Sequence, residues 1–135
     1  MRSMNSLEIG GAAPQFIVRD VPETLAFWRD KLGFTVAFEG PEPDDIFFGM
    51  VERGRAMFMF KAIGTDPVPN HTRDVGRGSP PWDAYVYVPD PDALYEEFAG
   101  KGVEFHTPIG DNSDNLRGFE VKDPNGYVIY FGRPN

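Results

Sequence analysis

The chain has 135 residues, of which 13 are lysine or arginine and 21 are aspartate or glutamate, so its formal net charge is −8. This acidic balance argues against nucleic acid and anionic lipid surfaces as partners, because both need a basic face. The absence of cysteine excludes disulfides, thiolate metal sites and cysteine nucleophiles. No apolar run approaches the ~20 residues of a membrane span. We therefore expect a cytoplasmic protein with one domain over 1–135.

The first predicted helix covers 20–32 and has its own start and stop signals. Asp20 can cap the first turn, Pro22 lies where a missing N–H is tolerated, and Gly33 can adopt the left-handed conformation that ends a helix. Apolar residues recur at helical spacing: Val21, Leu25, Trp28 and Leu32. A short strand precedes this helix. Strand-like runs follow at 34–39, 46–51 and 55–61, with breaks predicted at 40–43 and 53–54.

The same pattern returns in the second half of the chain. Asp90 lies 70 positions after Asp20, and a second helix is predicted over 90–100. A strand precedes it, and three strand-like runs follow at 103–109, 116–121 and 127–132. This internal repeat predicts an α+β fold of two βαβββ modules. The modules would cover about 12–62 and 82–133, and a loop at 63–81, rich in proline, glycine and charge, would join them.

Two motifs carry a resemblance to a known family. The first helix ends in Leu-Gly-Phe at 32–34, and Asp-Pro-Asn-Gly at 123–126 precedes the last strand. With these motifs, residues 12–133 resemble the vicinal oxygen chelate superfamily of glyoxalases, bleomycin resistance proteins and extradiol dioxygenases. The resemblance implies that the two modules form a curved mixed sheet with a concave cleft. It also implies a homodimer, in which each cleft is shared between subunits in proteins of the bleomycin-resistance type.

Enzymes of that superfamily hold a metal ion on the concave face through His, Glu or Gln side chains of the first and last strands of each module. The corresponding positions in this chain are Ala13, Phe58, Asp83 and Tyr130. Alanine and phenylalanine offer no donor, tyrosine is a rare ligand, and Asp83 alone cannot hold a catalytic ion. Gln15, two residues after Ala13, could replace the missing first-strand ligand only weakly. We therefore expect no metal ion, no cofactor and no catalytic residue, as in the metal-free bleomycin-resistance branch.

Period-two alternation predicts which side chains face the cleft. In the strand near 84–88, the aliphatic side chains at even positions should pack under the second helix, which leaves odd positions for the cleft. The predicted ligand-binding residues are Gln15, Phe58, Trp82, Asp83, Tyr85, Tyr87 and Tyr130. Their aromatic rings offer stacking and cation–π contacts, and the Asp83 carboxylate would favour positively charged ligands.

These features predict metal-independent binding or sequestration of a small aromatic molecule, neutral or cationic, as in antibiotic resistance of the bleomycin type. Two alternatives stay open. One is a metal-dependent glyoxalase-type lyase, isomerase or dioxygenase whose ligands lie elsewhere in the chain. The other is a structural or regulatory dimer with a closed cleft. Metal analysis of the purified protein distinguishes the metal-dependent enzyme from a binding protein. A ligand-sized cavity in a structure distinguishes a binding protein from a dimer with a closed cleft.

Overall fold

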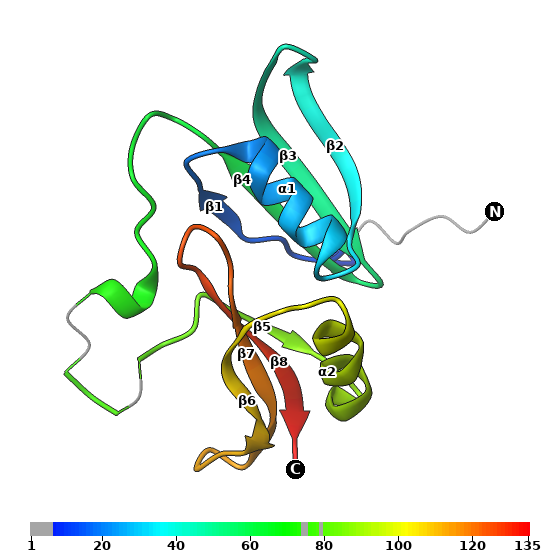
Figure 1. The fold of residues 1–135 in the computed structure, drawn as a ribbon, viewed down its shortest axis with the longest axis vertical. Coiled ribbons are helices and arrows are strands. Elements are labelled where there is room, and N and C mark those ends of the chain that lie inside the picture. The colour runs from blue at the N-terminus through cyan, green and yellow to red at the C-terminus, as the bar shows by residue number, and fades with distance from the viewer. Residues whose placement is uncertain (1–6, 74–75, 79) are drawn as a thin grey trace.

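The computed structural model describes residues 7–73, 76–78 and 80–135. The helices and strands follow one another in an order that repeats once (Figure 1). They are β1 (Gln15–Ile17), α1 (Val21–Asp30), β2 (Thr35–Glu42), β3 (Asp45–Arg53), β4 (Ala56–Lys61), the 3-10 turn η1 (Asn70–Thr72), β5 (Ala84–Tyr87), α2 (Pro91–Gly100), β6 (Phe105–Asp111), β7 (Leu116–Lys122) and β8 (Val128–Pro134). The predicted βαβββ order is confirmed in both halves. We call β1 to β4 with α1 module 1, and β5 to β8 with α2 module 2.

Both helices begin directly after the predicted capping aspartates, and α2 ends at Gly100 as predicted, whereas α1 ends at Asp30, two residues before its predicted end. The Asp20 side chain accepts a hydrogen bond from the backbone N–H of Glu23 at 2.9 Å, and Asp90 accepts one from Ala93 at 3.1 Å. Gly33, after α1, has a φ of 70°, which a side chain would disfavour. Among the described residues, neither helix has the length and apolar character needed to cross a membrane.

The strand β2 runs further than predicted. A break was predicted at 40–43, yet β2 continues to Glu42, which pairs with Asp45. The register shifts between Gly40 and Pro41, so the ladder resumes beyond the irregularity. Because β2 is an edge strand, the missing N–H of Pro41 does not break a central ladder.

Each module has one four-stranded sheet, in the orders β1-β4-β3-β2 and β5-β8-β7-β6. The first strand of each module pairs in parallel with the last, and the other pairings are antiparallel. One helix covers one face of each sheet. Under α1, the ring of the fully buried Trp28 lies 4.4 Å from Phe58. Under α2, Phe98 lies 5.7 Å from Phe119 and 5.3 Å from Phe131. The opposite face of each sheet, here called its outer face, is covered by neither α1 nor α2, the two α-helices of the described residues.

The hairpin at 123–126 joins the two modules. The Asn125 amide nitrogen donates to the Thr24 hydroxyl at 3.0 Å, and Asn125 is only 7% exposed. Next to it, the Tyr127 hydroxyl donates to the backbone carbonyl of Ile17 at 2.6 Å, and its ring stacks on Phe16 at 4.3 Å. We call this buried contact the module joint.

A second contact between the modules lies near the surface. The Arg53 guanidinium pairs with the Glu97 carboxylate through two hydrogen bonds of 2.7 and 2.8 Å and donates a third to the Leu32 carbonyl at 2.9 Å. This pairing lowers the pKa of Glu97 to about 2. Both side chains are more than a third exposed, so solvent screens the pair and its net contribution to stability is modest.

Asp123 makes the module joint sensitive to pH. The residue is 4% exposed, and burial raises the pKa of its carboxyl to about 6, although hydrogen bonds from Asn125 and Tyr127 oppose this. Because the folded chain holds this proton more tightly than the unfolded chain, the associated stabilisation is full below pH 3.8 and is lost as the pH rises through about 6.

We therefore expect the free energy of unfolding of the wild type to fall by up to about 3 kcal/mol between pH 4 and pH 7, relative to Asp123→Asn. Asparagine keeps one acceptor oxygen and does not titrate. Urea unfolding at a series of pH values measures the difference. Parallel pH profiles for the two proteins would contradict the expectation.

Candidate functional site

A cavity of about 810 Å³ lies on the outer face of module 2. Strands β7 and β8 form its floor, and the β6–β7 hairpin forms one wall. The other wall is contributed by His71, Arg77, Gly78 and residues 80–82. Its volume falls within the range of about 300–1,000 Å³ that is usual for small-molecule sites.

Alternation along β7 and β8 sets which side chains reach this cavity. Phe119 and Phe131 point toward α2, where both are buried against Phe98. Their neighbours Gly118, Glu120 and Tyr130 therefore face the other way and line the cavity.

Three aromatic rings pack together at one end of the cavity, where Trp82 and Tyr130 belong to its lining and Tyr85 lies beside them; we call the three rings the aromatic floor. The Tyr130 ring stacks on Trp82, with centroids 4.5 Å apart, and on Tyr85, with centroids 5.7 Å apart. The Tyr130 ring lies flat because two glycines are beneath it. A Cβ at Gly118 would come within 2.7 Å of the Tyr130 hydroxyl oxygen, and one at Gly132 within 2.5 Å of its ring.

The Tyr130 hydroxyl has no hydrogen-bond partner within the described part of the chain, although the residue is only 3% exposed. An unsatisfied buried hydroxyl costs free energy. Burial, followed by Tyr85 and Glu120, raises the pKa of Tyr130. The hydroxyl therefore stays protonated and able to donate a hydrogen bond at neutral pH.

A carboxylate lies beside the aromatic floor. Trp82 Nε1 donates to Glu120 Oε2 at 2.9 Å, and the Thr107 hydroxyl donates to Oε1 at 2.9 Å. His106 Nε2 lies 3.8 Å from Oε1. The Glu120 side chain is 18% exposed, so its charge is largely shielded from bulk water.

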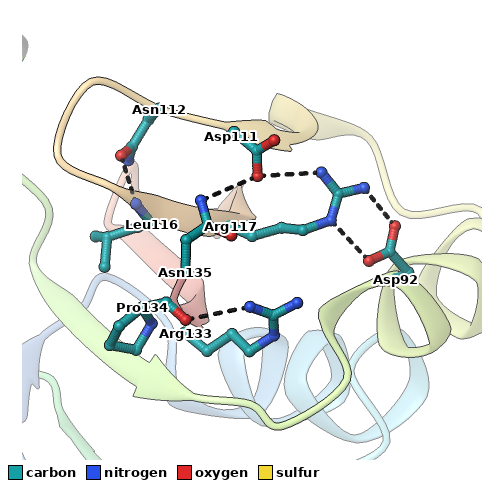
Figure 2. A network of polar contacts seen from close by, with 8 residues as sticks. All are labelled: Asp92, Asp111, Asn112, Leu116, Arg117, Arg133, Pro134 and Asn135. Atoms are coloured by element: carbon teal, nitrogen blue, oxygen red, sulfur yellow. Dashed lines mark hydrogen bonds and ion pairs between the residues drawn. The ribbon is translucent and has the colours of Figure 1, made fainter.

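Figure 2 shows how the hairpin wall is held. The Arg117 guanidinium on β7 donates to both oxygens of Asp92, at 2.7 and 2.9 Å, and to Asp111 at 3.3 Å. The Asn135 amide also donates to Asp111, at 3.2 Å. At the hairpin tip, Asn112 accepts from the backbone N–H of Leu116. These contacts connect the wall to α2 and to the C-terminal strand.

The structure brings together some of the residues that the sequence predicts for the cleft. Trp82 and Tyr130 line the cavity, and Tyr85 stacks beside them. Tyr87 is 64% exposed and lies further along β5.

Asp83 has a different position from the one predicted. One carboxylate oxygen accepts from the backbone N–H of Asn70, and the other accepts from that of Val128, both at 2.8 Å. Asp83 therefore fastens the loop around η1 to the start of β8. The cavity lining does not include it.

The predicted placement of Phe58 on the cleft face is wrong. Phe58 is 2% exposed and packs under α1, because it pairs with Val51 on the helix-facing side of the sheet. Gln15 is exposed and pairs with Met59 in module 1, so it belongs to the other sheet.

Sequence reasoning missed Glu120 and Thr107, although alternation between Phe119 and Val121 places Glu120 on the outer face. It also missed His71, which reaches the cavity by bonding to the carbonyl of Gly126, 55 residues away, at 2.8 Å. No local pattern could have indicated that contact.

The residues present do not fit a metal ion of the kind that the family's enzymes hold. Phe58 lies in the core, both Asp83 oxygens accept backbone N–H groups, and Tyr130 is a protonated phenol. Over 7–73, 76–78 and 80–135, no three His, Cys, Asp or Glu side chains group as a ligand set. A divalent ion needs more donors than these positions supply.

The glycine beneath Tyr130 gives a direct test of the floor. We expect Gly118→Ala to lower the free energy of unfolding by about 1–3 kcal/mol and to displace the Tyr130 ring, because the added methyl group overlaps both the backbone carbonyl of Phe131 and that ring. Gly110→Ala is the matched control, since a Cβ there meets nothing within 4 Å although Gly110 lines the same cavity. Equal stability of the two variants in thermal unfolding would contradict this account.

Similar folds occur among solved structures. The chain is 30% identical to a bleomycin-binding protein from bleomycin-producing Streptomyces verticillus, solved with copper(II)-bleomycin, over 96% of this chain and 99% of that one, with a TM-score of 0.69. TioX from Micromonospora sp. ML1 is 18% identical over 93% and 99% of the two chains, with a TM-score of 0.71. A further bleomycin-binding protein, solved with bleomycin, is 18% identical over 94% and 100%, with a TM-score of 0.70.

A search of curated proteins gives no match. The family model described as Glyoxalase/Bleomycin resistance protein/Dioxygenase superfamily matches residues 12–131, nearly the whole chain. Together with the two βαβββ modules, this match shows that the chain belongs to the glyoxalase/bleomycin resistance/dioxygenase superfamily.

Proposed function

We propose that this protein binds and sequesters a small aromatic molecule in the cavity of module 2, without a metal ion. The observation that carries the proposal is the cavity of about 810 Å³, whose lining includes Trp82 stacked on the buried Tyr130. A flat ligand would stack on the face of Trp82 that Tyr130 leaves free. Similarity to proteins that bind bleomycin supports ligand binding rather than turnover.

A site of this kind can supply the free energy that ligand binding requires. Each aromatic contact contributes about 0.5–1.5 kcal/mol beyond the burial of apolar area. Burial of apolar ligand surface adds about 25 cal/mol per Å². A micromolar complex needs only about −8 kcal/mol in total.

We also propose that two copies assemble as a homodimer. The outer face of module 1 carries several apolar side chains, among them Phe38, Phe48, Met50 and Met59. This face points away from α1, because Gly49 between Phe48 and Met50 lies against Leu25 of that helix. Phe38 is 49% exposed, and such an apolar face favours a partner surface over water. A second copy would cover it and complete the cleft.

The dimer has a direct test. We expect sedimentation equilibrium at micromolar concentration to give twice the chain mass, and Phe38→Asp to shift the protein toward monomer by placing a charge in the apolar interface. Val68→Asp, which introduces the same charge at an apolar side chain that is 54% exposed in the inter-module loop, should leave the mass unchanged. A wild type that sediments as a monomer would contradict the proposal.

Ligand binding can be followed through Trp82. A thermal-shift screen of flat aromatic compounds should yield ligands that raise the melting temperature and quench tryptophan emission. The chain has two tryptophans, and Trp28 is fully buried in the core, so a ligand can reach only Trp82. We expect Trp82→Phe to abolish the quenching and Tyr130→Ala to weaken binding about tenfold, since each removes part of the stacking surface.

Tyr95→Leu is the matched control for these variants. It removes an aromatic ring from the helix side of the same sheet, where Tyr95 packs on Phe105, and it should leave ligand affinity unchanged. Equal binding by all three variants would contradict the cavity assignment. One firmly held divalent metal ion per chain, found by elemental analysis, would favour the metal-dependent enzyme instead.

A further inference from the structure

We propose that Glu120 makes the site selective for planar aromatic cations that carry an N–H donor on the ring or directly attached to it. The inference rests on the proposed function and deepens it, because it names the charge of the ligand and the residue that recognises it. The sequence had assigned this role to Asp83, whose two oxygens are already engaged by backbone N–H groups.

The hydrogen bonds of Glu120 leave its charge uncompensated. Its two donors, the Trp82 indole and the Thr107 hydroxyl, are neutral, and each occupies one of the two acceptor positions on an oxygen. Across the described residues, no lysine or arginine forms an ion pair with this carboxylate, and His106 at 3.8 Å is its nearest basic neighbour. Each oxygen therefore keeps an acceptor position for a charged donor.

The other ionisable groups around the cavity do not take over this role. Asp111 is paired with Arg117 and also accepts from Asn135. Asp114 lies on the exposed hairpin tip, so water screens its charge. Arg77 and His71 line the cavity wall on the loop side. Among the carboxylates that line the cavity, Glu120 alone is both half-buried and beside the aromatic floor.

The contact between Trp82 and Glu120 fixes where the charge lies relative to the rings. The indole N–H points outward in the plane of its ring, so the carboxylate that accepts it at 2.9 Å lies at the ring edge. A flat ligand stacked on the face of Trp82 that Tyr130 does not cover would then bring an N–H group on its own edge close to Glu120. Charge-assisted hydrogen bonds of this kind are about twice as strong as neutral ones.

Charge selectivity can be measured with two probes of the same shape. At about pH 8, 9-aminoacridine is a cation, because its ring nitrogen is strongly basic. Acridine has a weakly basic ring nitrogen and is uncharged at this pH. Fluorescence titration should show that the wild type binds 9-aminoacridine about tenfold more tightly than acridine. This comparison requires no variant.

Glu120→Gln then assigns the preference to one residue. Glutamine preserves the shape of the side chain: its oxygen can accept from Trp82, and its amide can donate to the Thr107 hydroxyl, which also accepts. We expect this variant to bind 9-aminoacridine about tenfold more weakly and acridine within about threefold of wild type. Asp114→Asn removes the same charge from the cavity rim and should change neither affinity by more than about twofold.

Three outcomes would overturn the inference. They are equal affinity of the wild type for the two dyes, equal weakening of both dyes by Glu120→Gln, and failure of both dyes to bind the wild type. None of these decides the proposed function, which is tested separately by quenching of Trp82 with ligands from the screen. If no ligand from the screen quenches the Trp82 emission of the wild type, the proposed function is contradicted as well.

Discussion

Each module has a single helix for a sheet with two faces, and most of the structure follows from this constraint. The helix covers one face with aromatic and aliphatic side chains, among them Trp28 in module 1 and Phe98 in module 2. The outer face is left for something other than the core. In module 2 it carries the cavity, and in module 1 it carries an exposed apolar surface.

The two outer faces differ in chemistry although their modules share one topology. In module 1 the outer face has flexible methionines, Met50 and Met59, which adapt to surfaces of varied shape. In module 2 it has stacked rings held flat over glycines, with one shielded carboxylate beside them. In the proposed dimer, the adaptable outer face of module 1 would lie opposite the rigid outer face of module 2. Such a pair of surfaces would suit a cleft that binds a flat ligand.

The sequence alone predicts the fold more completely than it predicts the site. Capping aspartates, helix-ending glycines and the repeat were sufficient to predict both modules, because each signal acts within a few residues. Phe58 was misplaced because a one-residue error in strand register moves a side chain to the opposite face of the sheet. Asp83 was misassigned because its partners Asn70 and Val128 lie 13 and 45 residues away. Glu120 was overlooked although alternation along β7 places it correctly.

The two contacts between the modules have different physical characters, and this has a consequence for how the halves move. The joint at Asn125 is buried, so dissolved ions screen its contacts far less. The Arg53–Glu97 pair is exposed, and added salt weakens it. Raising the ionic strength would therefore loosen one side of the boundary and leave the other side closed. The joint would then act as a pivot, and the angle between the two sheets would respond to the salt content of the surroundings.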